Sequence, residues 1–280
     1  MQMSGEHIIK PYERVKFIIE LLKYIMSKGY SGISVYGSIW FNGLIQSIEK
    51  EANIRLTEDI DFLVEKDVVK NVNQLKLFVN EFLILCDLRN FVVEIERYPV
   101  ENKSGVISIM RGGTDILLID ITIDPGVSKL ESVIYGTFKA NGPELAKCIA
   151  DKISAISTDK LKRRVKDFYD IYLLSTIFNF NFQDIQRYFS EGLTIEPFNF
   201  FRNNRLDLKL LYENLNEFKN IESIPTFDVV WPRVAEFIRV FNDQSFKDSH
   251  GTWSKEGRGE WVEARKPIFD GLSKSSVFDK

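Results

Sequence analysis

Two aspartates stand at the start of an apolar segment in RLTEDIDFLVE, which runs from Arg55 to Glu65. Residues two apart in a strand face the same side, so Asp59 and Asp61 would lie side by side while Ile60 and Phe62 face a core. Like charges held this close raise each other's pKa. Oxygen ligands of this kind suit Mg²⁺, which proteins hold with a few carboxylates and substrate phosphates. The pair therefore indicates a cation site, or alternatively an edge strand whose acids are solvated or paired with a nearby arginine.

A third aspartate, Asp120, interrupts the run ILLIDIT, which is otherwise typical of a core strand. A buried carboxylate needs a partner, either a cation or a metal ion. The alternative is an acid satisfied by backbone N–H groups or by an arginine. Asp124, in IDPG, is more typical of a turn. We expect Asp120 to complete the ligand set begun by Asp59 and Asp61.

The dipeptide Gly37-Ser38 follows the strand-like segment SGISVY and precedes a helical pattern over Ile39–Lys50. A helix N-terminus presents unpaired N–H groups and a partial positive charge, and glycine lets an anion approach the backbone. Ser38 could donate its hydroxyl to a phosphate oxygen, or it could simply cap the helix. A phosphate-binding Gly-Ser, a paired-carboxylate strand and a third carboxylate together predict a two-metal site for phosphoryl or nucleotidyl transfer.

The order Gly-Ser, helix, Asp-x-Asp resembles the DNA polymerase β-like nucleotidyltransferase superfamily. The segments RLTEDIDF and DKISAISTDKLKRRVKDFYDIYLL resemble, more specifically, the AbiEii/AbiGii toxin family of type IV toxin–antitoxin and abortive-infection systems. The resemblance covers Ser34 to Leu174. That family has a lysine early in a helix and then an Arg/Lys-Asp-x-x-Asp segment. The matching residues here are Lys152 and, within KDFYD, Asp167 and Asp170.

The resemblance implies a role for each matched residue. Gly37 and Ser38 would hold the β,γ-phosphates, and Lys152 would contact the phosphates as well. Asp167 or Asp170 would complete the helical motif. The implied metal ligands are Asp59, Asp61 and Asp120; the implied catalytic residues are these three with Lys152 and Asp170; the implied nucleotide-binding residues are Gly37, Ser38, Lys152 and Asp167. Arg55 and Thr57, just before the Asp pair, are further nucleotide-binding candidates because they could orient phosphate; alternatively they stabilise the loop.

The later motif residues also carry a simpler interpretation. A lone Lys or Asp on a helix is normally solvated. Lys152 and the acids Asp167 and Asp170 fall on successive helical patterns, so they can share a cleft with the sheet only if those helices fold back on it. Asp167 and Asp170 are about one turn apart and need a cation, for which Arg163, Arg164 or Lys166 are candidates. The run KLKRRVK is a solvated face or, alternatively, a grip for RNA phosphates.

The function implied by the resemblance is that of a metal-dependent nucleotidyltransferase toxin. It would use Mg²⁺, with two ions in the site and Mn²⁺ as a substitute, and would transfer a nucleoside monophosphate from an NTP, with GTP or CTP expected. The expected acceptor is RNA, specifically tRNA, and a cognate antitoxin is the expected protein partner. The alternatives are a small-molecule or protein nucleotidyltransferase, and a catalytically silent nucleotide-binding protein. A silent scaffold gains nothing from clustering acids that repel.

Composition excludes several other classes. The 280 residues carry a net charge of −3, so the chain is no polycation that coats nucleic acid. Two cysteines, Cys86 and Cys148, and two histidines make neither a disulfide framework nor a thiolate or imidazole metal site. We expect both thiols to be buried and reduced. The N-terminus lacks an apolar targeting segment and no apolar run could span a bilayer, so a cytoplasmic protein without membrane association is predicted.

Hydrophobic periodicity divides the chain into two halves, and the expected class is α+β. Helices are expected over Pro11–Gly29, Ile39–Lys50 and Lys66–Arg89, with strands in FVVEIERYPV, GVISIMRG and TDILLIDITID. Gly112-Gly113 is interpreted as a hairpin turn, not as a phosphate loop, and SVIYGTFKANGPE as a further edge strand. From Pro143 onward the patterns are helical, and the last thirty residues lack periodicity and are expected to be loop. We therefore predict a nucleotidyltransferase-like mixed sheet flanked by helices at 1–140 and a helical domain contributing to the active-site cleft at 141–280.

Overall fold

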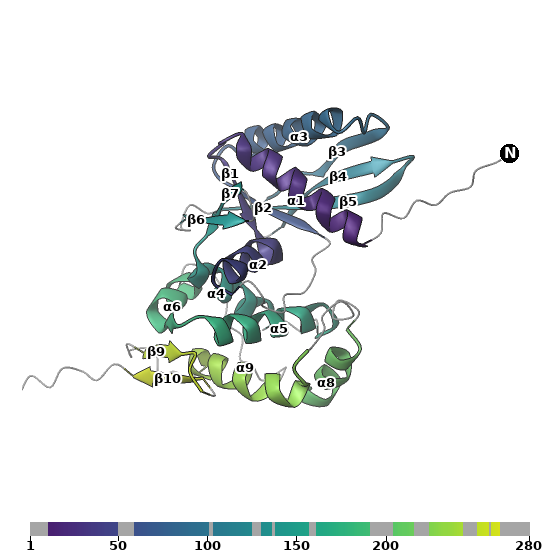
Figure 1. Ribbon diagram of the computed structural model, residues 1–280. Helices are drawn as coiled ribbons and strands as arrows, with labels where there is room; N and C mark the ends of the chain where they lie inside the picture. Colours follow the sequence, from purple (N-terminus) through teal and green to yellow (C-terminus); the bar gives the residue numbers. More distant parts are fainter. Residues whose placement is uncertain are drawn as a thin grey trace, which may run out of the picture.

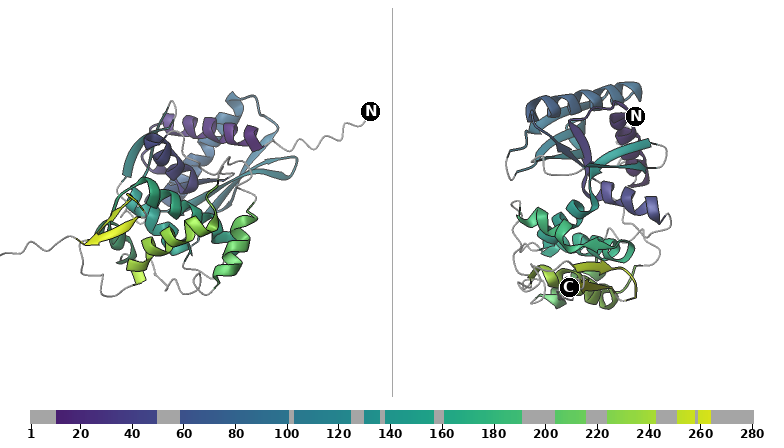
Figure 2. Two further views of the ribbon diagram at one scale, coloured as in Figure 1. Left: turned by 60° about the horizontal axis from the view of Figure 1, so that its bottom comes forward. Right: turned by 90° about the vertical axis from the view of Figure 1, so that its left-hand side faces the viewer.

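The computed structural model describes residues 11–49, 59–100, 103–124, 130–135, 138–156, 161–190, 204–215, 224–242, 251–257 and 259–263. A sheet with flanking helices forms one half of the molecule and a mostly helical unit forms the other (Figure 1). The α+β class predicted from sequence is confirmed. Two further views show the same two halves, with the C-terminal strands beside the helices of the helical unit (Figure 2).

Five strands form the main sheet in the order β1-β2-β5-β4-β3. Their bounds are β1 Ile33–Tyr36, β2 Ile60–Val64, β3 Phe91–Arg97, β4 Gly105–Arg111 and β5 Thr114–Ile123. The pair β2–β5 is parallel, whereas the other pairs are antiparallel. The predicted turn at Gly112-Gly113 joins β4 to β5, with both glycines at positive φ. The strands β2 and β5 are neighbours in the sheet. In the register of this pair, residues at the start of β2 lie beside the middle of β5.

Helices α1 (Pro11–Ser27) and α3 (Val68–Leu85) cover the side of the sheet away from the helical unit, and α2 (Gly37–Ile48) lies on the other side (Figure 1). Their predicted positions along the sequence are confirmed. Period-2 burial fixes which face of the strands meets the core, since Ile60, Phe62 and Ile119 are fully buried. The alternate residues of β2 and β5 therefore face α2 and the helical unit.

The predicted extra edge strand is wrong, because SVIYGTFKANGPE forms a sheet of its own. Strands β6 (Leu130–Tyr135) and β7 (Phe138–Pro143) pair with each other as a hairpin, so they satisfy each other's backbone groups and do not extend the main sheet. The hairpin instead packs closely over β1 and α2. A side chain at Gly142 would overlap the ring of Trp40, with its Cβ only 2.4 Å from Cδ2.

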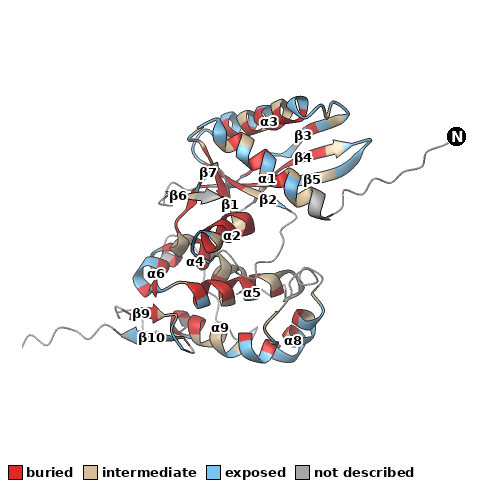
Figure 3. Ribbon diagram, in the orientation of Figure 1, coloured by how far each residue is buried: buried red, intermediate tan, exposed pale blue. Residues whose placement is uncertain are grey.

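The helical unit consists of α4 (Leu145–Ile156), α5 (Leu161–Ile177), α6 (Phe182–Ser190), α8 (Arg205–Glu213) and α9 (Phe227–Asn242). Each falls on a helical pattern recognised in the sequence. The buried residues make two hydrophobic cores, one between the sheet and its helices and one inside the helical unit (Figure 3). Helix α2 takes part in both, with Ile39 in the first core and Phe41 in the second. The division into domains 1–140 and 141–280 stays a prediction.

The prediction of a loop at the end of the chain is wrong for the hairpin of β9 (Gly251–Ser254) and β10 (Glu260–Glu263). With β8 (Phe180–Asn181) these strands form a three-stranded sheet. Trp253 is fully buried and its indole N–H donates to the carbonyl of Ser175 at 2.8 Å, while Trp261 donates to Phe237 at 2.8 Å. Strands of four residues are too short to show periodicity, so the sequence pattern could not reveal this segment. The two tryptophans anchor it.

The expectation of two buried thiols is half wrong. Cys148 is buried in α4, but Cys86 is exposed because it follows the last residue of α3, where the helical pattern ends. Among the described residues, no helix is long and apolar enough to cross a membrane.

Candidate active site

The register of three strands aligns the candidate carboxylates in a row. Asp61 of β2 lies opposite Asp120 in the parallel pairing with β5, and it lies opposite Tyr36 in the antiparallel pairing with β1. Residues paired in this way point to the same side of a sheet. The side chains of Tyr36, Asp61 and Asp120 therefore project from the face that meets the helical unit, as predicted for the two acids.

The row opens into a cavity of about 290 Å³ between the sheet and the helical unit. Asp59, which precedes β2, faces the same cavity and is exposed. Of the residues predicted from sequence, those lining this cavity are Gly37, Ser38, Asp59, Asp61, Asp120, Lys152 and Asp167. Arg55 and Thr57 lie outside the described residues. The structure thus brings together residues that lie far apart in the chain.

Gly37 begins α2 and touches the carboxylate row. Its φ of 67° is in the left-handed region, and a Cβ placed on it would lie 2.0 Å from Oδ2 of Asp61. Only glycine is compatible with both conditions. Tyr36 occupies the N-cap position without a side-chain cap, so the alternative interpretation of Ser38 as the helix cap is wrong. Ser38 is instead a buried residue of the first turn of α2, where backbone N–H groups are available to an anion.

We expect Gly37→Ala to move the Asp61 carboxylate and to lower nucleotidyl transfer at least ~10-fold, because a misplacement of about 1 Å is enough for such losses. The matched control is Gly112→Ala. Gly112 also has a left-handed φ, 59°, but a Cβ there would meet nothing within 4 Å. Backbone strain should cost each variant about 1 kcal/mol of stability, and Gly37→Ala should lose more because the Asp61 side chain must also shift; urea unfolding measures both. Equal transfer rates in the two variants would show that contact with Asp61 is not what Gly37 provides.

Burial and mutual repulsion dominate the electrostatics of the carboxylates. Burial raises the pKa of Asp61 to about 7, with further contributions from Asp59 and Asp120 that Lys152 and Lys166 oppose. The pKa of Asp120 is raised as well, by burial first and then by Asp59. Asp61 therefore carries an unfavourable charge near neutral pH, and this site favours any added cation.

The donor set fits a hard divalent cation that also binds substrate oxygens. Asp59, Asp61 and Asp120 offer only oxygen ligands, and Asp59 and Asp120 lie close enough to Asp61 to add to the rise in its pKa that burial causes. Within the described part of the chain, no three acidic, histidine or cysteine side chains form a group able to hold a metal ion unaided. Mg²⁺ is commonly bound by one or two carboxylates, with substrate phosphates supplying further ligands. This set fits such a shared site better than a metal cage built by the protein alone.

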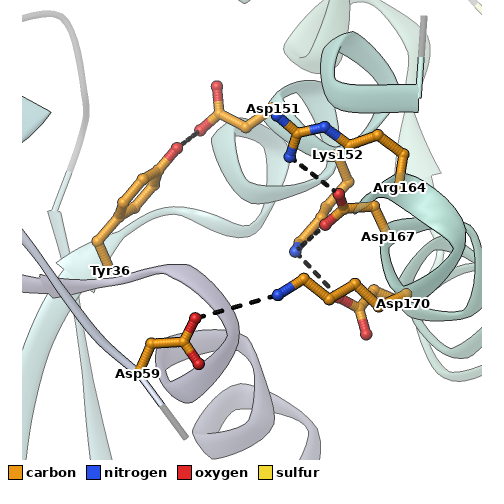
Figure 4. Close-up of polar contacts among 8 residues, drawn as sticks. Tyr36, Asp59, Asp151, Lys152, Arg164, Asp167 and Asp170 are labelled. Carbon is orange, nitrogen blue, oxygen red and sulfur yellow. Dashed lines mark hydrogen bonds and ion pairs between the residues drawn. The ribbon is translucent and has the colours of Figure 1, made fainter. Parts of the chain in front are cut away.

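Helices α4 and α5 fold back on the sheet, as the shared-cleft prediction required, and supply a second charged cluster (Figure 4). The Lys152 ammonium lies 2.6 Å from Oδ1 of Asp167 and 2.9 Å from Oδ2 of Asp170. Arg164 binds the other oxygen of Asp167 at 3.3 Å. Asp167 lines the cavity, whereas the Asp170 side chain has no exposed surface and reaches the site through Lys152. Of the cations predicted for these two acids, Arg164 pairs with Asp167, but the main partner of both is Lys152, which was not among those predicted.

Tyr36, Lys147 and Asp151 were not singled out from the sequence, and Lys166, a candidate partner of Asp167 and Asp170, was not expected to pair with Asp59. The Tyr36 hydroxyl donates to Asp151 (Figure 4). The Asp151 carboxylate also pairs with Lys147 at 2.5 Å. Lys166 faces the carboxylates, with its ammonium 4.0 Å from Oδ2 of Asp59. In the sequence these residues look like ordinary solvated positions on helices or the end of a strand. The only available signal was adjacency, since Asp151 precedes Lys152 and Lys166 precedes Asp167.

Residues 52–244 match the model of a protein family described as nucleotidyl transferase AbiEii toxin, type IV toxin–antitoxin system. The chain belongs to the AbiEii family. This match includes the carboxylate strand β2, Asp120 on β5 and the Lys152 cluster. It confirms the resemblance drawn from Asp-x-Asp and from the later lysine and acid motifs. A search of curated proteins found no match.

Solved structures similar to this AbiEii-family chain are distant. The Megavirus polyadenylate synthase has 18% sequence identity and a TM-score of 0.42, over 63% of this chain and 33% of that one. A nucleotidyltransferase-like antigenic protein from Paracoccidioides brasiliensis has 13% identity and a TM-score of 0.40, covering 72% and 93%. MenT4, a nucleotidyltransferase toxin from Mycobacterium tuberculosis, has 15% identity and a TM-score of 0.36, covering 60% and 63%. The chain thus spans a third of the length of the first of these proteins.

Proposed function

We propose that this protein is a metal-dependent nucleotidyltransferase toxin that transfers a nucleoside monophosphate from an NTP to RNA. The observation that carries the proposal is the cavity in which a glycine-led helix N-terminus, three carboxylates and a half-buried lysine meet. Membership of the AbiEii family supports the toxin role. A cognate antitoxin is proposed as its partner, and tRNA as the acceptor, with GTP or CTP as the donor.

The residues of the cavity suit the separate tasks of this reaction. Asp59, Asp61 and Asp120 would hold Mg²⁺, which when bound would offset charge on the phosphates. Gly37 and Ser38 would receive the β,γ-phosphates at the start of α2.

Transfer requires the acceptor hydroxyl oxygen to bond to the α-phosphorus while the bond from that phosphorus to the β-phosphate oxygen breaks. Asp120 would accept the hydroxyl proton, and its raised pKa brings it closer to the neutral range in which a base is effective. Lys152 would donate to the phosphate oxygens and so stabilise the departing pyrophosphate.

The test is label transfer from each of the four α-³²P-labelled NTPs to total RNA in the presence of Mg²⁺. We expect label in RNA with one preferred NTP and a loss of about 10²-fold in Asp120→Asn, the size typical of removing a general base. The control is Asp115→Asn on the same strand, which is exposed and should retain full transfer. If label appears only on protein or on small molecules, the acceptor is one of these and not RNA. If the protein binds NTP without transferring label, it is a catalytically silent nucleotide-binding protein.

Growth of cells expressing the protein gives a second, independent outcome. If nucleotidyl transfer causes toxicity, Asp120→Asn should relieve growth arrest and Asp115→Asn should not. Equal growth arrest by wild type and Asp120→Asn would separate toxicity from transfer.

A further inference from the structure

Three cationic side chains line the cavity, and they have different partners. On the helical side, Lys152 pairs with Asp167 and Asp170, and Arg164 pairs with Asp167. Lys166 instead faces the sheet. Its ammonium lies 4.0 Å from Asp59, and its charge acts on both Asp61 and Asp120. Of the three cationic side chains that line the cavity, Lys166 is thus the one whose charge acts on all three carboxylates.

The ion pair of Lys166 with Asp59 is weak and easily broken. Its distance is at the outer limit of a salt bridge, and the two side chains are 33% and 51% exposed. Pairs of this kind contribute little to stability, about 0–1 kcal/mol. Lysine also has a long flexible stem and three donors, so its ammonium can move to a new partner at small cost.

We propose that Lys166 competes with the divalent cation for Asp59 and, once the metal and nucleotide are bound together, transfers its ammonium to the nucleotide phosphates. This inference rests on the proposed function. Lys166 and a divalent cation repel each other when both lie at the oxygens of Asp59. Lys166 therefore opposes metal binding in the absence of nucleotide. An NTP removes the opposition because its phosphates offer Lys166 a new anionic partner. Metal and nucleotide would therefore bind cooperatively.

The experiment measures Mn²⁺ binding by the full-length protein, from the electron paramagnetic resonance signal of free Mn²⁺, with and without α,β-methylene analogues of the four NTPs. Removing a unit charge some 4 Å away in a solvated site corresponds to about a fivefold change in affinity. We expect Lys166→Met to bind Mn²⁺ about fivefold more tightly without nucleotide and to bind the preferred analogue about fivefold more weakly. Lys166→Arg should behave as the wild type in the first measurement.

Two controls distinguish competition at Asp59 from a general change of charge. Lys209→Met removes a lysine that pairs with Asp228 on the surface of the helical unit, and it should change neither affinity. Arg164→Met removes a cavity cation that is already bound to Asp167. An equal gain in Mn²⁺ affinity in Arg164→Met, or no gain in Lys166→Met, would overturn the inference, as would unchanged analogue binding in Lys166→Met.

The inference and the proposed function fail in different ways. If wild type and Lys166→Met bind Mn²⁺ equally and RNA labelling proceeds, only the role of Lys166 is wrong. If the wild type binds no Mn²⁺ with or without any analogue, the metal site itself is wrong and both fall.

Discussion

Replacing Asp61 by Asn should reduce nucleotidyl transfer by about 10³-fold or more while leaving a folded protein that is more stable than the wild type at pH 8. The loss follows from the position of Asp61 at the centre of the row, between Tyr36 and Asp120 and in contact distance of any side chain placed at Gly37. In the proposed reaction Asp61 would hold the metal ion that stabilises charge at the reacting phosphate. Losing such a ligand should raise the activation free energy by several kcal/mol, and each 1.4 kcal/mol corresponds to about a factor of ten in rate.

The gain in stability follows from the pKa of Asp61. In the folded protein this pKa is raised from 3.8 to about 7, so the folded state binds the proton more tightly than the unfolded state does. Between pH 4 and pH 7 stability therefore falls as pH rises, and the full cost is present above pH 7. The shift sets an upper limit of about 4 kcal/mol. Because solvent and the nearby lysines screen the charge, we expect Asp61→Asn to be stabilised by about 1–2 kcal/mol at pH 8 and by little at pH 4.

Urea unfolding at pH 4, 6 and 8, without added divalent cations, measures this difference directly. The control is Asp115→Asn, an exposed acid at the far end of β5 that should show neither the gain in stability nor the loss of transfer. A stability difference between wild type and Asp61→Asn that does not change with pH would contradict the assignment of a raised pKa. Retained transfer would remove Asp61 from the reaction.

The sheet half of the site was predictable because strand periodicity is a local property. The alternation Ile60, Asp61, Phe62 fixes which side chains meet the core, and a carboxylate flanked by apolar residues at Asp120 indicates a special environment. What the sequence could not show is the strand order. The parallel pairing that sets Asp61 beside Asp120 joins segments nearly sixty residues apart, with α3, β3 and β4 between them in the chain.

The helical half was accessible only through family resemblance. Lys152 and Asp167 are charged residues on helices, which in isolation are typical of a solvated surface. They are shielded from solvent because α4 packs against both α5 and α2, a tertiary effect that no local pattern encodes. The same limitation concealed the position of Lys166. The sequence offered it as a partner of Asp167 and Asp170, but its ammonium lies 4.0 Å from Asp59, over a hundred positions earlier.

Local patterns also failed where elements are short. The segments of β9 and β10 have four residues each, and their anchors are the buried tryptophans at 253 and 261, not an alternating pattern. Cys86 was misplaced for a related reason. An apolar helical pattern continues almost to its position, but α3 ends at Leu85 and leaves the thiol exposed.

Replacing Lys152 by Met should both abolish transfer and lower the free energy of unfolding by about 3–5 kcal/mol, the cost of leaving buried charges without their partner. The Lys152 ammonium binds Asp167 and Asp170 at 2.6 and 2.9 Å, and their side chains are 5% and 0% exposed. Arg164 can still compensate Asp167 in the variant. Asp170 is fully buried and lies 2.9 Å from the lost ammonium, so its carboxylate should carry most of the loss.

The double variant Lys152→Met, Asp170→Asn separates this structural role from a chemical one. Removing the second charge should restore stability to within about 1 kcal/mol of the wild type, because the buried negative charge that Lys152 had offset is gone as well. Transfer should stay lost, since no ammonium then faces the phosphates. Urea unfolding and RNA labelling are measured on the same preparations, with Asp184→Ala on the exposed face of α6 as the control. If transfer returned together with stability, Lys152 would act only by holding α4 against α5, and the phosphate contact would have to come from Arg164 or Lys166.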